Sequence, residues 1–346
     1  MEKNIKNNQE KEEYVLIDLL KFIFAIMIVG IHTQTMNDSN SNVQWYILHI
    51  IYRAAVPFFF LSSGFLFGKK YLKNKENLKL NTTRQIKRLL IPFLFWMLVS
   101  LPYIIITTTG QNVIVIILKI LRKAIFYPWG ALWFILALIL AIAIEYFFLK
   151  KKKLRIALII SAFLYIIGLL GNSYYFVLDG IFKKAMDIYI TICVSTRNGI
   201  FVAFPIFTVG VYLATKEKMI EKLSKSKISI CFIIILLAQI IEVTFIRNCN
   251  YADDHSLFFT TIPIVTILLI ICIKSKNIKF KKINNKLLRN LSTGIYFLHM
   301  PIIRYSSFFN LNLGNWQMFF MTTILALLIC LIANKINNKY INYIIK

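Results

Sequence analysis

Residues 15–36 have the sequence VLIDLLKFIFAIMIVGIHTQTM, in which residues 22–31 carry no charge. An apolar segment of about 20 residues is long enough to cross the hydrocarbon core of a bilayer as a helix. Comparable segments, such as Ile228–Ile241 and Ile262–Ile273, follow along the chain of 346 residues. The chain is 58% hydrophobic and 16% charged, with a mean hydropathy of +0.67, whereas soluble domains are about 25% charged. The sequence therefore predicts a multi-pass membrane protein and excludes a soluble enzyme, a disulfide-stapled secreted module and a disordered tail.

Connectors rich in Lys, or containing Asn, Gly or Pro, separate these apolar segments. The pattern predicts an all-α fold with ten transmembrane helices in a single domain that covers residues 1–346. We place the ten helices at about 15–36, 46–67, 89–109, 130–149, 155–171, 198–214, 228–246, 256–273, 291–309 and 316–334.

The basic residues are distributed unevenly between the two sides of this topology. Of the 41 Lys and Arg, 31 lie in the N-terminal segment, every second connector and the C-terminal tail, 7 lie in the other connectors, and 3 lie within helices. Connectors that carry excess Lys and Arg stay in the cytoplasm. The count predicts that both termini are cytoplasmic, in a multi-pass protein of the cell membrane. It also explains the net charge of +26 without a nucleic-acid partner.

Two external connectors are long enough to carry structure. In residues 111–126 an apolar run is followed by Lys119, Arg122 and Lys123 on one helical face. We therefore expect an amphipathic helix in the outer interface rather than an eleventh span. Residues 172–197 form the other long external segment. The five cysteines are scattered, with no CxxC pair, so we expect buried thiols and no metal site.

The first helix carries three ionisable side chains, Asp18, Lys21 and His32. At 100° per residue, Lys21 and His32 lie within roughly 20° of each other around the helix, and Asp18 lies within roughly 40° of His32. The rise separates Lys21 from His32 by about 16 Å along the helix. Such groups are costly inside a bilayer and indicate function or a polar contact between helices. For Asp18 and Lys21 both interpretations stay open, whereas an imidazole suits proton transfer at neutral pH and favours function for His32.

Other candidate functional residues lie further along the chain. His49 and Arg53 are one turn apart, and Arg53 needs an anion, carbonyl groups or a watery cavity, whereas His49 is more consistent with a structural role. Glu242 is placed to pair with Arg53 or Arg197, or to bind a substrate hydroxyl. His299 precedes a proline that can free a carbonyl, and it is a candidate for contact with substrate.

Charged residues near the inner interface allow simpler interpretations. Arg84, Lys87 and Arg88 lie on adjacent turns where the third helix begins, a pattern that fits either a phosphate site or topology alone. Glu145 precedes the Lys150–Lys153 run, and we expect it to reach the interface as a partner for those lysines.

Several segments, taken in order, resemble landmarks of the membrane acyltransferase family 3, whose members acylate cell-surface sugars and related acceptors. They are Asp18-Leu-Leu-Lys21 with Ile31-His32, Arg53-Ala-Ala-Val-Pro57, Arg84-Gln-Ile-Lys87-Arg88, Trp129-Gly130-Ala-Leu132-Trp133, Arg197-Asn198-Gly199 and Gly294-Ile-Tyr296-Phe-Leu-His299. The Arg-Asn-Gly segment is most similar to the subgroup that includes the membrane halves of vancomycin-resistance serine racemases.

The resemblance implies transfer of an acyl group, typically acetyl from cytoplasmic acetyl-CoA, to a hydroxyl of a cell-envelope glycan or a small acceptor. The essential histidine of the family corresponds to His32, and its basic partner to Lys21, where many members have Arg. The family's basic pair corresponds to Arg84 with Lys87 or Arg88. On this interpretation the three cations hold the phosphates of CoA.

The same comparison suggests roles around the thioester. His32 is expected to act as a general base or to carry the acyl group transiently, and Arg53 to stabilise the oxyanion. The expected acceptor-binding residues are Glu242, Arg197, Asn198, Tyr296, His299 and Trp133. A transporter for a small polar substrate such as an amino acid, and a non-catalytic partner subunit, are the alternatives.

Overall fold

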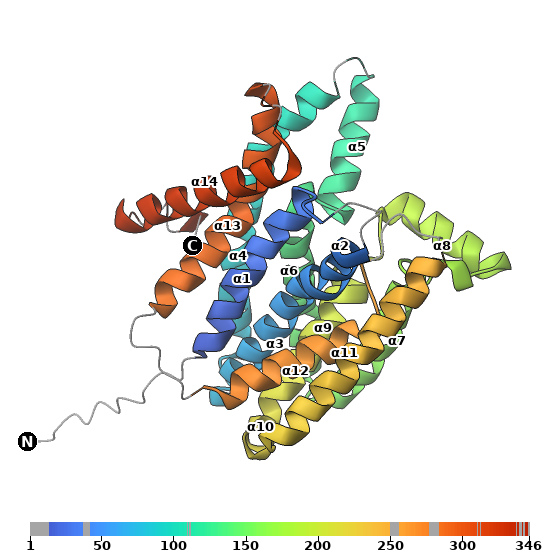
Figure 1. Cartoon of the computed structure of the whole chain (residues 1–346), viewed down its shortest axis with the longest axis vertical. Helices are drawn as coiled ribbons and strands as arrows, with labels where there is room; N and C mark the ends of the chain where they lie inside the picture. Colours follow the sequence, from blue (N-terminus) through green and yellow to red (C-terminus); the bar gives the residue numbers. More distant parts are fainter. Residues whose placement is uncertain are drawn as a thin grey trace, which may run out of the picture.

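The computed structural model describes residues 14–36, 42–108, 110, 112–249, 256–276, 284–309, 311, 313–336, 338, 341, 343 and 344. These residues form helices and connecting turns, and no strand is present among them. Figure 1 shows the helices packed as a bundle, in which α1 lies between α3 and α13 although α13 is far away in the chain. The all-α fold class is therefore confirmed.

The helices follow one another in the order expected from the apolar segments. They are α1 (Val15–His32), α2 (Asn42–Tyr46), α3 (Ala55–Lys73), α4 (Leu78–Thr107), α5 (Val113–Phe126), α6 (Trp133–Lys150), α7 (Leu154–Leu170), α8 (Gly180–Cys193), α9 (Phe204–Thr215), α10 (Glu217–Lys222), α11 (Lys225–Asn248), α12 (Thr261–Lys274), α13 (Asn285–Ser306) and α14 (Asn315–Ile336). Short π-helical turns, Ile47–Ile51 and Gly199–Ala203, precede α3 and α9.

Within the described residues, six helical segments are long and apolar enough to cross a membrane. They are Val15–His32, Asn42–Lys73, Leu78–Thr107, Gly130–Lys150, Lys225–Asn248 and Asn315–Ile336. Three further predicted spans fall on shorter apolar helices, Leu154–Leu170, Gly199–Thr215 and Thr261–Lys274. The tenth falls on α13, whose first half is polar. A helix of 17 residues rises about 26 Å, less than the hydrocarbon thickness of about 30 Å. The count of ten spans and the cytoplasmic termini stay predictions.

The centre of the bundle is the contact between α3 and α9. A Cβ added at Gly64 would lie 2.1 Å from the carbonyl oxygen of Phe207, and one added at Gly210 would lie 2.1 Å from that of Leu61. Two backbones can approach this closely only where a side chain is missing. Ser62, two residues before Gly64, is fully buried and donates to the Phe58 carbonyl at 2.6 Å.

We expect Gly64→Val to destabilise the protein strongly. The new side chain would overlap a backbone carbonyl that cannot rotate away, and overpacking of a core costs at least about 1–3 kcal/mol. Thermal unfolding of the purified protein in detergent measures the effect. Gly314→Ala is the control, because its Cβ would meet no described atom closer than Gln317 Oε1 at 3.7 Å. Equal unfolding temperatures for the two variants would contradict the prediction.

The predicted amphipathic segment is α5, which has no buried residue. Asn112 caps it by accepting from the Ile114 amide at 2.9 Å. Arg122 Nε donates to the Ile192 carbonyl at 3.1 Å and so links α5 to the last turn of α8, which lies within the other long connector. Figure 1 shows both helices at the periphery of the bundle. The predicted helix is confirmed, whereas its place in the outer interface stays a prediction.

Candidate active site

Two histidines face each other where α1 and α13 lie side by side. His32 is the last residue of α1, and its ring centroid lies 5.2 Å from that of His299 in α13. His299 is 0% exposed, and its Nδ1 lies 3.1 Å from the Ile295 carbonyl oxygen. Because a carbonyl only accepts, Nδ1 carries the proton and Nε2 keeps a lone pair. Among the described residues this Nε2 has no hydrogen-bond partner.

An unpaired acceptor in a buried position costs free energy and calls for a reason. A hydroxyl or amine of a ligand bound beside His299 would donate to Nε2 and would lie next to His32. Sequence reasoning selected each histidine separately. It did not place them together, because the contact joins helices that are distant in the chain.

Three arginines act electrostatically on His32: Arg53, Arg197 and Arg304. Arg197 Nη2 donates to the Tyr127 hydroxyl at 2.8 Å, and its Cζ lies 5.8 Å from the centre of the Trp133 ring. Positive groups held in place around a poorly solvated centre stabilise negative charge that develops there. The site is therefore suited to a reaction that passes through an anion.

Arg304 is the member of this group to which sequence reasoning gave no role. Its Cζ lies 5.2 Å from the centre of the Tyr103 ring, and a Cβ added at Gly130 would lie 3.1 Å from its Nη2. Gly130 also has φ +64°, a conformation that favours glycine. The Trp129-Gly130 motif thus leaves room for a guanidinium. An arginine inside a predicted span was the available signal.

A small cavity lies at the end of α1, lined by Gly30, Ile31, Gln34, Met36, Leu48 and Arg53. Its volume is about 160 Å³, enough for about five waters. Lys21 does not belong to its lining, so among the described residues this cavity does not extend from Lys21 to His32. Ser292 of α13 packs beside Lys21 and donates to its carbonyl at 3.1 Å.

At the other end of the α1–α13 contact, Asp18 joins the two helices. Asp18 is 5% exposed and pairs with Arg289 Nη1 at 2.9 Å. Lys21 lies one turn further along α1 and experiences the charges of both Asp18 and Arg289. Asp18 therefore makes the polar contact between helices that the sequence allowed. Its partner Arg289 was counted only as a connector charge.

Arg84, Lys87 and Arg88 lie near the start of α4 with exposed side chains. No hydrogen bond or ion pair joins them to any described residue. Their charges are therefore available to an anion from solution. The phosphate site and the role in topology both stay predictions.

Two aromatic residues named from the sequence contribute to the walls of the site. The Tyr296 hydroxyl donates to the Ala131 carbonyl, and its ring centroid lies 5.9 Å from that of His299. Trp133 stacks on Tyr127 with centroids 5.8 Å apart and an interplanar angle of 8°. Both side chains hold the segment before α6 against α13 and the arginines.

Asn198 has a positioning role. Its Oδ1 accepts from the amides of Ile200 and Phe201 at 2.9 and 3.1 Å, and its Nδ2 donates to the Tyr189 hydroxyl at 2.7 Å. The amide therefore caps the turn before α9 and fixes the backbone beside Arg197. A role in binding substrate would require these bonds to be exchanged.

The structure places Glu242 away from the arginines. Its carboxylate accepts from the Tyr174 hydroxyl, from the amides of Phe259 and Thr260 at 2.6 and 2.9 Å, and from the Thr260 hydroxyl at 2.6 Å. These donors occupy the carboxylate, so the suggested pairing with Arg53 or Arg197 does not occur. Glu242 instead fixes the segment that leads into α12.

Glu145 and His49 both make contacts that stabilise the packing of the helices. Glu145 is 0% exposed and accepts from Thr208 Oγ1 at 2.7 Å, so the expectation that it reaches the Lys150–Lys153 run is wrong. The side chain lies on the face of α6 that packs against α9. His49 donates from Nδ1 to the Trp45 carbonyl at 2.9 Å and stacks on the Trp45 ring, which agrees with a structural role.

These observations define a class of protein, a multi-pass helical membrane protein in which two histidines, one of them fully buried, face each other near three arginines. The chain belongs to the acyltransferase 3 family, whose acyltransferase domain matches residues 14–335. The resemblance inferred from the ordered motifs is thereby confirmed. Membership supports a membrane acyltransferase in general terms and agrees with the apolar helices.

Curated relatives point to the same subgroup. An amino-acid racemase of Enterococcus faecalis is 31% identical over 219 residues, covering 62% of this chain and 30% of the relative. A second amino-acid racemase of that species is 24% identical over 83% of this chain and 40% of its own length. A serine/alanine racemase of Enterococcus gallinarum is 28% identical over 73% and 36%. The matches therefore span less than half of each relative. No solved structure matches the chain significantly.

Proposed function

We propose that this protein transfers an acetyl group from acetyl-CoA to a hydroxyl of a cell-envelope glycan or a small acceptor at the cell membrane. The observation that carries the proposal is the pairing of the partly buried His32 with the buried His299, which has a free acceptor on Nε2, in a chain of the acyltransferase 3 family. One imidazole that takes the proton of a hydroxyl, beside a second that holds the same acceptor molecule through another donor group, suits the activation of an oxygen nucleophile.

In the proposed reaction His32 takes the proton from the acceptor hydroxyl, and His299 Nε2 orients the acceptor by accepting a hydrogen bond from a second O–H or N–H group of the same molecule. The oxygen attacks the thioester carbonyl, and the negative charge moves to the carbonyl oxygen. Arg53, which lines the small cavity, is assigned to this oxyanion. The carbon–sulfur bond then breaks, and the thiolate of CoA takes up the proton from His32. Atoms and charges balance without a metal or a redox partner.

The acyl donor must reach His32 from the cytoplasmic side. The cavity of about 160 Å³ at the end of α1, which neither His32 nor His299 lines, is smaller than the roughly 300 Å³ at which ligand pockets begin. We therefore infer that binding of acetyl-CoA widens the contact between α1 and α13. The ion pair of Asp18 with Arg289, whose side chain is 48% exposed, lies at the end where such widening would start.

One assay tests the proposed function. Purified full-length protein is mixed with radiolabelled acetyl-CoA and cell-envelope extract, and both label transfer and release of free CoA are measured. We expect label on an extract component together with an equal amount of free CoA. Absence of both, with protein that remains monodisperse, would overturn the proposal.

The proposed binding of the CoA phosphates by Arg84 and Arg88 leads to a separate prediction. Reversing charge in Arg84→Glu/Arg88→Glu should raise the apparent KM for acetyl-CoA at least tenfold and change kcat little, because the cations are assigned to binding alone. The initial rate is measured as acetyl-CoA is varied. The matched control is Lys150→Glu/Lys151→Glu, which reverses two positive charges at the C-terminal end of α6. An unchanged KM would mean that Arg84 and Arg88 only set topology.

A second candidate function follows from the relatives, which are named for amino-acid substrates. On that interpretation the protein transports a small amino acid through its helical bundle and does not acylate a glycan. Proteoliposomes that accumulate radiolabelled serine without acetyl-CoA would favour it. If a small amino acid instead gains the acetyl label, the protein is an acyltransferase and that amino acid is its acceptor.

A further inference from the structure

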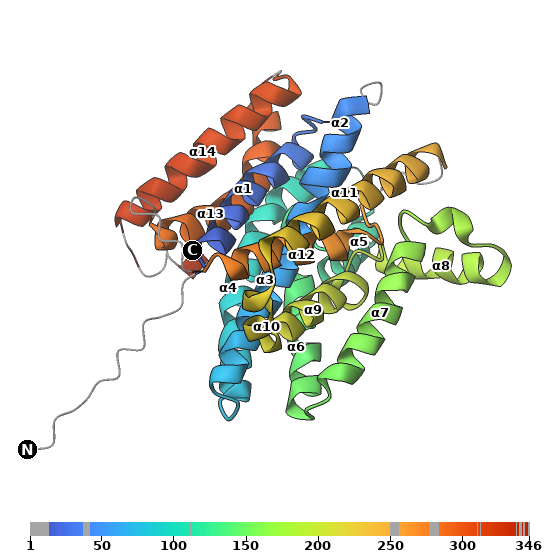
Figure 2. The ribbon, with the colours of Figure 1, turned by 60° about the horizontal axis from the view of Figure 1, so that its bottom comes forward.

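A groove separate from the histidine pair lies between α11 and α12, which run side by side in Figure 1 and Figure 2. Its volume is about 790 Å³, within the range of about 300–1,000 Å³ that is typical of ligand pockets. Its lining consists of Glu221, Lys225, Ile228, Ser229, Phe232, Ile233, Ile271, Lys274, Ser275 and Lys276. None of these residues takes part in the proposed acyl transfer. The groove therefore needs an explanation of its own.

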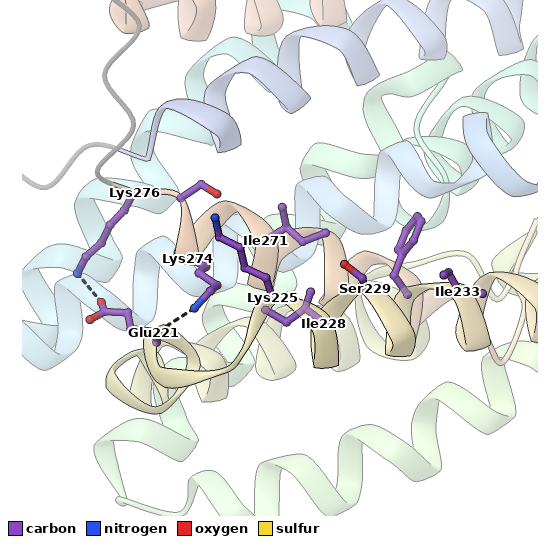
Figure 3. A pocket seen from close by; sticks show the side chains of 10 residues that line it. Glu221, Lys225, Ile228, Ser229, Ile233, Ile271, Lys274 and Lys276 are labelled. Carbon is purple, nitrogen blue, oxygen red and sulfur yellow. Dashed lines mark hydrogen bonds and ion pairs between the residues drawn. The ribbon is translucent and has the colours of Figure 1, made fainter.

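The groove has one charged end and one apolar end. Figure 3 shows the lysines gathered where α11 begins and α12 ends, whereas Ile233 lies at the other end. Lys225 and Ile233 lie eight positions apart in α11, a rise of about 12 Å. Ile233 is 56% exposed, and its neighbours Ile230 and Ile234 are also exposed. In a membrane protein such a face lies against lipid, so the apolar end is open to the bilayer.

The lysines at the charged end of the groove, here called its mouth, differ in whether they have a partner. Lys276 pairs with the Glu221 carboxylate at 2.5 Å and Lys274 donates to the Glu221 carbonyl at 3.0 Å, as the dashed lines of Figure 3 mark. Lys225 has no hydrogen bond or ion pair with any described residue. Lys276 also lies 3.5 Å from the carboxylate of Glu217, which in turn pairs with Lys69. Four lysines against two carboxylates leave the mouth positive. Lys225 stands at the first turn of α11, where the helix dipole also favours an anion.

We propose that this groove binds an anionic glycerophospholipid, with its phosphate at Lys225 and one acyl chain along Ile228, Phe232 and Ile233. The match is one of charge and polarity: a phosphate faces the lysines, and a hydrocarbon chain faces the isoleucines. The adenine and pantetheine of CoA are polar and would leave the apolar end unmatched. The lysine-rich end belongs to the predicted cytoplasmic side, so the lipid comes from the inner leaflet.

Native mass spectrometry of the full-length protein, delipidated in a zwitterionic detergent, tests the proposal. Dioleoyl phosphatidylglycerol and dioleoyl phosphatidylcholine are titrated separately. We expect the wild type to bind phosphatidylglycerol more tightly. Lys225→Gln should weaken that binding about fivefold, the effect of removing one lysine from contact with an anionic headgroup. The matched control, Lys227→Gln, removes an exposed lysine of the same helix that does not line the groove.

A second pair of variants tests the apolar end with every charge intact. Ile233→Trp fills the groove and should also weaken phosphatidylglycerol binding, whereas Ile234→Trp alters an equally exposed neighbour outside the lining and should not. Equal effects of Lys225→Gln and Lys227→Gln would overturn the proposal, as would displacement of the lipid by glycerol phosphate or CoA, or equal binding of the two lipids. Acetyl transfer is not measured, so the result is independent of the proposed function.

Discussion

Replacing His32 by Gln should lower the rate of acetyl transfer by a factor of about 10²–10⁴, the usual contribution of a general base. The loss should appear in kcat, because His32 is assigned to the proton and not to the phosphates of CoA. Glutamine keeps a polar side chain of similar size at the end of α1. Label transfer from acetyl-CoA at saturating donor measures the effect, with size-exclusion chromatography as the check on folding.

The matched control is His49→Gln. His49 is another membrane-embedded imidazole, but it stacks on Trp45 and donates to the Trp45 carbonyl. We expect His49→Gln to retain most of the acetyl transfer. Acetyl transfer by His32→Gln within twofold of the wild-type rate would remove the proposed base.

Arg53→Gln should lower kcat by about 10²–10³-fold, the range observed when a donor to a developing oxyanion is removed. The KM for acetyl-CoA should stay close to its wild-type value, since the contact forms in the transition state. Arg53→Lys should recover part of the rate, because it keeps the charge and loses the planar fork. Steady-state rates at varied acetyl-CoA separate these parameters.

The control for Arg53 is Arg247→Gln. Arg247 is an arginine of α11 that lies over the Trp45 ring, 5.3 Å from Cζ to the centroid. Loss of its charge should leave kcat unchanged. A rise in KM with an unchanged kcat in Arg53→Gln would instead place Arg53 in donor binding.

The sequence predicted the helical fold and its order because apolar length and lysine-rich connectors are local properties. It predicted helix length less well: the segment at 256–273 becomes Thr261–Lys274, since hydropathy does not show where a helix begins. The shared face of Lys21 and His32 followed from helical periodicity alone. These features required no knowledge of which helices are neighbours.

The contacts between helices could not be derived in this way. His299 carries no sign that it faces His32, because that contact depends on the packing of α1 against α13. Glu242 was assigned to an arginine or a substrate, whereas its partners are backbone amides of Phe259 and Thr260, which have no signature in side-chain identity. Arg304 was visible as a charge in a span, but its direction depends on Gly130 and Tyr103.

The two halves of the histidine pair come from helices made at very different times. α1 leaves the ribosome early, whereas α13 follows only after α12 has been synthesised. Asp18 can pair with Arg289, and His32 can face His299, only after α13 has been synthesised. The nascent chain therefore lacks the contact between His32 and His299 during most of translation, so under the proposed function an unfinished protein would not consume thioesters.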